Sequence, residues 1–276
     1  MEQVVAEHGS RLAAVQVTGE ANLAGVPAAA DGAFPGAREA LVRGLLRAAE
    51  AKRAAGATAA IGFAVAPEPD PDANGFWTGI RDLGGSDFAA AADYAGIDMY
   101  PDVFGTPTGI DGLPGAVRWV LRTYRERMLP VAGIGPATPV RVCENGWPTG
   151  PARPEETQAL ALEAVVRTVS DLRADLNVTH WELFALRDAD SSRDGLFYHF
   201  GVLRDDYSAK PAFGVLRDLM PNCPRPRACD RAEADRITAH PHRPPPGPIR
   251  TGTARAGAAW APQPAGCPGR SGRCRC

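Results

Sequence analysis

The chain has 276 residues, of which 45% are hydrophobic, and a formal net charge of −2 at pH 7. This length and apolar content suffice for one large α/β domain with a full core. The nearly neutral charge balance gives no electrostatic reason to expect a nucleic-acid or membrane partner. No run approaches the roughly 20 apolar residues of a membrane span, and the first residues lack the basic segment and apolar core of a secretory signal. The sequence leaves the cellular location open.

Short apolar runs alternate along the chain with longer amphipathic segments. Residues 1–11 are typical of the end of a helix capped by Gly9, so the chain is expected to begin in the middle of an element. Five strands are predicted, over residues 12–18, 58–65, 94–100, 140–143 and 177–184. Helices are predicted to follow them, over residues 36–55, 79–92, 114–128, 154–174 and 211–220.

Strands and helices that alternate at this spacing indicate βα units and a parallel sheet. Five strands fit either an open doubly wound sheet or part of an eight-stranded barrel. No glycine-rich phosphate loop follows any of the predicted strands, which counts against a nucleotide-binding sheet.

Two acids stand at the ends of predicted strands. Glu144 follows the run Val140–Cys143 and precedes a turn, and Glu20 follows the first strand in the same way. In a barrel both side chains would lie at the C-terminal rim, where such folds keep their chemistry. Two carboxylates about 5 Å apart suit a retaining glycosidase, and a gap of roughly 6.5–9.5 Å suits an inverting one. The alternative is that each acid only ends a strand in solvent.

The segment from about residue 222 differs in kind. It is rich in Pro, Arg, Ala and Gly, has no Lys and shows no apolar periodicity. We predict one domain over residues 1–221 and a disordered tail over residues 222–276, a possible out-of-frame product of a G+C-rich gene; a basic linker is the alternative. Five of the six cysteines lie in this tail, but the spacing Cys274-Arg275-Cys276 does not match the usual zinc sites. No metal or other cofactor is predicted.

Several motifs resemble those of clan A glycoside hydrolases, the (β/α)₈ group related to families 5 and 39. Residues 16–22, Gln-Val-Thr-Gly-Glu-Ala-Asn, resemble the fourth-strand segment of the clan. Residues 142–148, Val-Cys-Glu-Asn-Gly-Trp-Pro, resemble its seventh-strand nucleophile segment. Residues 184–190, 200–203 and 207–213 resemble its eighth-strand loop and final helix. The resemblance covers about residues 1–220 and implies an incomplete TIM barrel that carries strands four to eight.

The resemblance also implies roles for individual residues. Glu20 would be the general acid/base and Glu144 the nucleophile of a retaining enzyme that cleaves a β-glycosidic bond in a carbohydrate substrate by double displacement. Tyr100 would donate a hydrogen bond to the nucleophile; its alternative is a ring packed under a loop. Residues expected to contact the sugar are the turn asparagines and two indoles, Asn22, Asn145, Trp147 and Trp181, each of which could equally make a turn or belong to the core. Asp188 and Asp190 are interpreted as a solvated acidic loop; the alternative is that they bind a cation or contact a second sugar.

Two departures from the clan bear on activity. Gly19 stands where the clan usually has an asparagine that bonds the sugar 2-hydroxyl, a contact that strengthens in the transition state. The first three strands of the barrel have no counterpart, so we expect impaired activity in this chain. The alternatives are a catalytically inactive carbohydrate-binding relic and an unrelated open α/β enzyme.

Overall fold

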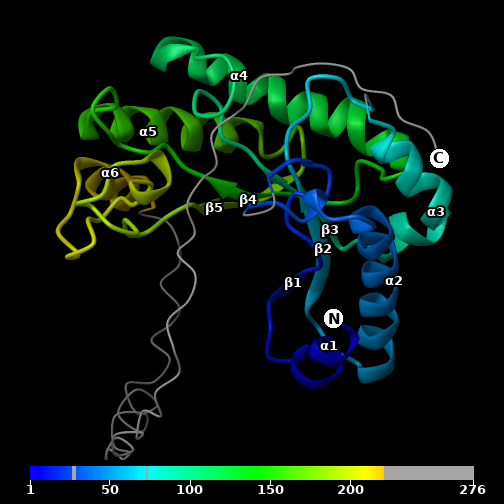
Figure 1. Cartoon of the computed structure of the whole chain (residues 1–276). Coiled ribbons are helices and arrows are strands. Elements are labelled where there is room, and N and C mark those ends of the chain that lie inside the picture. Colours follow the sequence, from blue (N-terminus) through cyan, green and yellow to red (C-terminus); the bar gives the residue numbers. More distant parts are fainter. Residues whose placement is uncertain (27–28, 73, 221–276) are drawn as a thin grey trace, which may run out of the picture. The chain divides into compact units, whose positions relative to one another are not determined.

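The computed structural model describes residues 1–26, 29–72 and 74–220. The tail predicted over residues 222–276 lies outside the described residues. The part described is a curled sheet of parallel strands with helices on its outer face, shown in Figure 1.

The sheet has five strands in the order in which they occur in the chain. They are β1 (Ala14–Gln16), β2 (Ala60–Val65), β3 (Tyr94–Asp98), β4 (Val140–Asn145) and β5 (Val178–Leu183), and all neighbours pair in parallel. Because parallel crossovers are right-handed, a sheet whose strands follow chain order receives all its helices on one face. This order confirms the predicted incomplete (β/α) barrel and is not that of a doubly wound sheet, whose strand order reverses. Within the described residues, β1 and β5 each lack a strand neighbour on their outer edge.

In the part of the chain that the structure describes, six α-helices accompany the strands. They are α1 (Glu2–His8), α2 (Ala37–Ala55), α3 (Phe76–Ala91), α4 (Gly109–Thr123), α5 (Glu155–Leu172) and α6 (Pro211–Leu219). The helix predicted from Pro114 begins five residues earlier, at Gly109, so that proline lies inside α4 and does not start it. The same segment continues as a π-helical turn, Tyr124–Met128, and a 3₁₀ turn, Leu129–Ala132. The third strand ends at Asp98, before Tyr100, and the fourth extends through Glu144 to Asn145.

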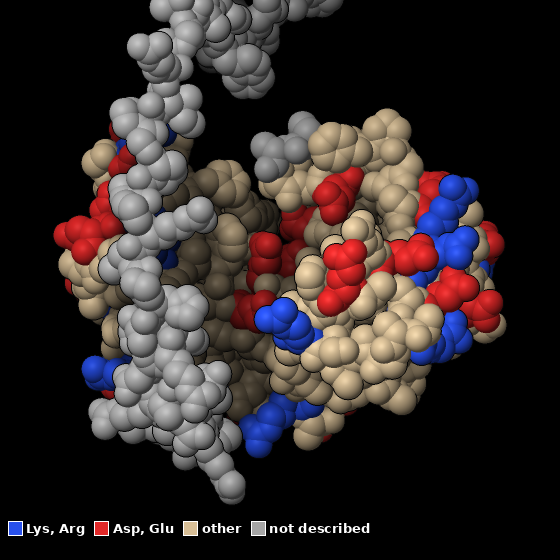
Figure 2. Space-filling model, turned by 90° about the horizontal axis from the view of Figure 1, so that it is seen from below, with Lys and Arg blue, Asp and Glu red and all other residues tan. Residues whose placement is uncertain are grey.

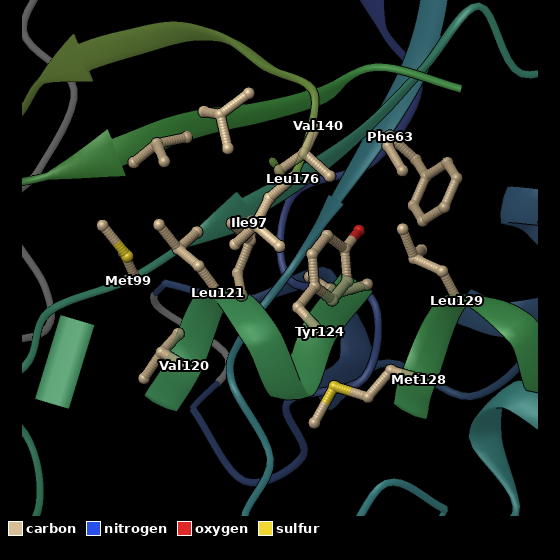
Figure 3. Packing of buried hydrophobic residues seen from close by; sticks show 14 of the residues in the cluster. Phe63, Ile97, Met99, Val120, Leu121, Tyr124, Met128, Leu129, Val140 and Leu176 are labelled. Carbon is tan, nitrogen blue, oxygen red and sulfur yellow. The ribbon is translucent and has the colours of Figure 1, made fainter. Parts of the chain in front are cut away.

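The hydrophobic core lies between the outer face of the sheet and the helices. Figure 3 shows Ile97 of β3 and Val140 of β4 beside Leu121 and Tyr124 of the α4 segment. The Tyr124 ring is fully buried, and its hydroxyl donates a 2.8 Å hydrogen bond to the carbonyl of Gly96. Burial of one such apolar side chain contributes about 1.5–3 kcal/mol, so these contacts fix α4 and its π turn against β3.

On the inner face of the sheet, side chains of neighbouring strands lie directly against glycine residues. A Cβ on Gly62 would lie 2.5 Å from the ring of Tyr94, and one on Gly96 would lie 2.7 Å from the Sγ of Cys143. The Arg141 guanidinium lies 4.1 Å from the centre of the Tyr94 ring. Only glycine leaves room for this layer, which fills the interior below the strand ends.

Candidate active site

Glu144 lies near the end of β4, where the pairing with β3 is irregular. The register shifts between Ile97 and Asp98, so that Asp98 pairs with Glu144. Such bulges re-aim side chains and occur often beside active sites. The Tyr100 hydroxyl donates a 2.6 Å hydrogen bond to Oε2 of Glu144. Burial, followed by this hydrogen bond, raises the pKa of the Tyr100 phenol well above its usual range, so the phenol keeps its proton and stays a donor.

Glu20 lies in the loop that follows β1. Its φ of 47° is in the left-handed region that residues with a Cβ seldom adopt and that is enriched at functional sites. The loop is held on both sides: the Gly19 amide donates to Oδ2 of Asp31 at 2.9 Å, and the Leu23 amide donates to the Glu20 carbonyl at 3.0 Å. Glu20 is therefore positioned by its backbone and not by the strand alone.

The two glutamates interact electrostatically. Burial first, and then the negative charge of Glu144, raise the pKa of Glu20 from 4.5 to about 7. A carboxyl group with this pKa can give and take a proton near neutral pH. Glu144, in contrast, accepts a hydrogen bond from the Tyr100 phenol. The two acids thus lie in different environments, as a pair of carboxyl groups with separate roles requires.

A third acid at this rim was missed by the sequence reasoning. Asp98 ends β3, is only 1% exposed, and neither of its carboxyl oxygens has a hydrogen-bond partner among the described residues. Burial, followed by the charges of Glu144 and Glu20, raises the pKa of Asp98 to about 8. Figure 2 shows acidic side chains gathered in a hollow on one face of the molecule. An acid that ends a buried strand was the signal used for Glu144, and it was equally present at Asp98.

Asn22 and Asn145, predicted to contact the sugar, are bonded to the protein. The Asn22 amide donates to the carbonyl of Ala66 at 2.9 Å and accepts from its amide at 2.8 Å, which ties the Glu20 loop to the end of β2. Asn145 is buried and donates to the Met99 carbonyl at 2.7 Å. Both side chains therefore hold the strand ends in place.

The two predicted indoles are also engaged within the protein. Trp181 packs against the core and donates from Nε1 to Oδ1 of Asn145 at 3.2 Å. Trp147 is buried, donates from Nε1 to Oδ2 of Asp102 at 3.3 Å, and lies under the Arg153 guanidinium at 4.6 Å. A sugar contact by either indole remains a prediction.

Asp188 corrects one interpretation of the sequence. The loop after β5 was expected to carry solvated acids, but Asp188 is almost fully buried. It pairs with the equally buried Lys210 at 2.8 Å and accepts from the Gly201 amide at 2.8 Å. The interpretation was wrong because the partner, Lys210, is distant in sequence and could not be anticipated from the loop.

Aromatic rings gather around Tyr100. The centre of its ring lies 5.4 Å from Phe104, 6.0 Å from Phe184 and 5.6 Å from Phe200, each in an edge-to-face arrangement. These phenylalanines come from the loop after β3 and from the segment after β5. None of the three was predicted as a site residue, because no local spacing links them.

No group of three or more His, Cys, Asp or Glu side chains arranged to hold a metal ion occurs in residues 1–26, 29–72 and 74–220. In the same part of the chain, no helix is long and apolar enough to cross a membrane.

The fold and the site together define a parallel half-barrel with a hydrogen-bonded carboxylate and a second carboxyl group of raised pKa at its rim.

No protein-family model and no curated protein matches the chain. Solved structures similar to it include a glycoside hydrolase family 17 β-1,3-glucanosyltransferase from Rhizomucor miehei, with 19% identity, a TM-score of 0.44, and coverage of 63% of this chain and 56% of that one. A β-glucuronidase from Ruminococcus gnavus in complex with D-glucuronic acid has 15% identity, a TM-score of 0.49, and coverage of 75% of this chain and 32% of that one. A β-D-glucuronidase from Dictyoglomus thermophilum has 12% identity, a TM-score of 0.46, and coverage of 67% and 29%. The chain thus spans less than two thirds of the length of each of these proteins.

Proposed function

We propose that this chain carries the catalytic pair of a retaining glycoside hydrolase that cleaves a β-glycosidic bond. The observation that carries the proposal is the contrast between the two acids. Glu144 accepts a hydrogen bond from Tyr100, whereas the pKa of Glu20 is raised to about 7. Retaining glycosidases need one carboxylate that attacks and one carboxyl group that exchanges a proton.

The reaction follows in two steps from these roles. In the first, the Glu144 carboxylate attacks the anomeric carbon while Glu20 gives its proton to the leaving oxygen, and a glycosyl ester forms on Glu144. In the second, ionised Glu20 takes a proton from water, the resulting hydroxide attacks the anomeric carbon, and the ester bond to Glu144 breaks. Each acid ends in its starting state, and the anomeric configuration is retained.

Tyr100 has a defined place in this scheme. Its hydrogen bond stabilises the ionised form of Glu144 that the first step needs and is renewed when the ester is cleaved. The proposed sugar contacts remain Asn22, Asn145, Trp147 and Trp181. The hydrogen bonds that these side chains make within the protein also stabilise the rim.

Catalytic strength is expected to be low in residues 1–276 alone. β1 and β5 end the described sheet on open edges, and a closed barrel of eight strands would need three more between them. Strand ends there would supply the rest of the rim that surrounds a bound sugar. We therefore propose slow turnover by an intact pair of acids, with a catalytically inactive carbohydrate-binding protein as the alternative.

The test is to trap the glycosyl ester on the purified chain. Incubation with 2-deoxy-2-fluoro β-glycosides that carry a good leaving group should add one fluorosugar, and peptide mass spectrometry should place it on Glu144. Glu144→Gln should abolish both the label and any hydrolysis of the matching 4-methylumbelliferyl β-glycosides. Glu182→Gln, a substitution of an exposed acid on β5, serves as the control and should keep the label.

Three results would contradict the proposal. Hydrolysis that survives in Glu144→Gln would exclude Glu144 as the nucleophile. A label on another residue would reassign it. Saturable sugar binding with neither label nor turnover would favour the inactive carbohydrate-binding protein. Rapid hydrolysis by the unmodified chain, lost in Glu144→Gln, would support the catalytic pair and refute the expected impairment.

A further inference from the structure

Two cross-links join the loop after β3 to the segment at the end of β4, and the hydrogen bond between Tyr100 and Glu144 lies beside both. The first cross-link belongs to the strand ladder, where the Met99 amide donates to the Glu144 carbonyl at 2.9 Å. The second is made by Asp102, whose Oδ2 accepts from Nε1 of Trp147 at 3.3 Å. Tyr100 stands between Met99 and Asp102 in the chain, so its position depends on both cross-links.

Asp102 makes further contacts besides the one to Trp147. Its Oδ1 accepts from the amides of Thr108 at 2.6 Å and Gly109 at 2.9 Å, where α4 begins. Its backbone carbonyl accepts from Nη2 of Arg153 at 2.7 Å, and the same guanidinium lies 4.6 Å from the centre of the Trp147 ring. One residue therefore joins the loop after β3 to the start of α4 and to the loop after β4.

The backbone and the charge of Asp102 suit this task. Its φ of 67° lies in the left-handed region, in which Asp and Asn occur more often than other residues with a Cβ. Burial by itself would raise the pKa of Asp102, but the hydrogen bonds that its carboxylate accepts and the charge of Arg153 outweigh burial and lower this pKa. The carboxylate is therefore ionised at neutral pH, and both of its oxygens are acceptors.

We infer that Asp102 is a positioning residue, which holds the Tyr100 hydroxyl against Glu144 by fastening the loop after β3 to Trp147. The inference rests on the proposed function, because it adds a residue to the same site. Hydrophobic contacts around the Tyr100 ring are not directional, so the backbone from which the ring projects decides where the hydroxyl lies. A displacement of about 1 Å in a catalytic site can lower the rate about a hundredfold.

Asp102→Asn separates the link to Trp147 from the cap of α4. Asparagine has nearly the same shape and caps helices as well as aspartate does, and its Oδ1 can still accept from the amides of Thr108 and Gly109. Its amide nitrogen would then face Nε1 of Trp147, so that two donors meet. Trp147→Phe removes the same hydrogen bond without changing the cap. Asp111→Asn is the matched control, because it makes the same chemical change at an exposed position in the first turn of α4.

The first measurement follows the Tyr100 hydroxyl directly and needs no turnover. The chain has 5 tyrosines, so labelling at Cζ gives 5 carbon signals, and Tyr100→Phe identifies the signal of Tyr100. In mixed H₂O and D₂O, this signal reports how fast the hydroxyl proton exchanges with solvent. Exchange should be about tenfold faster in Asp102→Asn and in Trp147→Phe, as expected for the loss of one hydrogen bond. It should be unchanged in Asp111→Asn.

The second measurement is a double-mutant cycle on kcat/KM for a 4-methylumbelliferyl β-glucoside. Asp102→Asn should lower kcat/KM about tenfold in the wild-type chain. It should have no effect in Tyr100→Phe, because that chain has no hydroxyl to position. A residue that only supports the fold would lower kcat/KM equally in both chains.

Unchanged hydroxyl exchange in Asp102→Asn and Trp147→Phe would overturn the inference. Equal losses of kcat/KM with and without the Tyr100 hydroxyl would also overturn it, as would equal effects of Asp111→Asn, because Asp102 would then act only through the fold or the helix cap. If no chain hydrolyses the glucoside but hydroxyl exchange responds as expected, Asp102 positions the hydroxyl as inferred and the proposed function fails. If Asp102→Asn does not fold, hydroxyl exchange in Trp147→Phe decides.

Discussion

Replacing Asp98 by Asn should change how the stability of the fold depends on pH. Asn has nearly the same shape as Asp but no charge to lose. In the folded chain, burial, followed by the charges of Glu144 and Glu20, raises the pKa of Asp98 from 3.8 to about 8. In the unfolded chain the same carboxyl group ionises near its ordinary pKa of about 3.9.

The direction in which stability changes with pH follows from proton binding. Between these two pKa values the folded state holds the Asp98 proton and the unfolded state does not, so stability is lost as the pH rises toward about 8. Each pH unit in this range lowers the free energy of unfolding by about 1.36 kcal/mol. A rise from pH 5 to pH 8 therefore lowers it by about 4 kcal/mol. This figure is an upper limit, because local relaxation around a newly ionised group reduces its cost.

The assay is urea unfolding of the wild-type chain and of Asp98→Asn at pH 5 and at pH 8, followed by far-UV circular dichroism. The variant should be the more stable protein at pH 8, and its advantage should shrink by a few kcal/mol at pH 5. Acids that do not interact with Asp98 titrate alike in both proteins, so their contributions cancel in the comparison. Asp87→Asn, the same chemical change at an exposed position of α3, should give no such difference.

Equal loss of stability by the wild-type chain and Asp98→Asn between pH 5 and pH 8 would refute the reasoning. It would mean that Asp98 is already ionised in the folded state and has found a partner or water. A variant that is less stable than the wild-type chain at both pH values would point to a needed carboxylate.

Three further predictions concern other contacts. Tyr100→Phe removes the hydrogen bond to Glu144 and should reduce kcat/KM for an aryl β-glucoside about tenfold to a hundredfold, since a bond to a charged group contributes about 1.5–3 kcal/mol. Glu144→Gln should lower the pKa of Glu20 from about 7, because the charge of Glu144 is one of its two causes, and carbon NMR of the labelled carboxyl group would show the shift. Lys210→Met leaves Asp188 buried without its partner and should cost about 3–5 kcal/mol in urea unfolding at pH 7.

Controls for these variants come from the same chain. Lys52→Met breaks a partly exposed ion pair with Asp93 and should cost about 1 kcal/mol or less; an equal loss for Lys210→Met would mean that the buried pair is open to water. Tyr207→Phe removes an exposed phenol and should leave kcat/KM unchanged. A Glu20 pKa that stays near 7 in Glu144→Gln would leave burial as its only cause.

The sequence determined the alternation of strands and helices and the positions of two acids. Glu20 follows β1, and Glu144 lies near the end of β4. Both are local properties: apolar runs of strand and helix period specify elements, and Glu20 and Glu144 follow directly on such runs. Only the resemblance to clan A glycoside hydrolases suggested Tyr100 as a partner of Glu144. Sequence patterns could not set the boundaries of α4, because Pro114 favours a helix start and the packing of Ile110 and Leu113 against the core extends the helix before it.

The tertiary structure alone decided which polar groups are buried and against what. Asp98 and Asp188 are both acids beside strand ends. Asp98 has no hydrogen-bond partner among the described residues, whereas Asp188 pairs with Lys210, which comes from a later segment. The stacked rings of Phe104 and Phe197 join loops after β3 and β5 in the same way. Burial and pairing depend on what lies opposite a residue in space, and that is set when β3, β4 and β5 align side by side, not by neighbours along the chain.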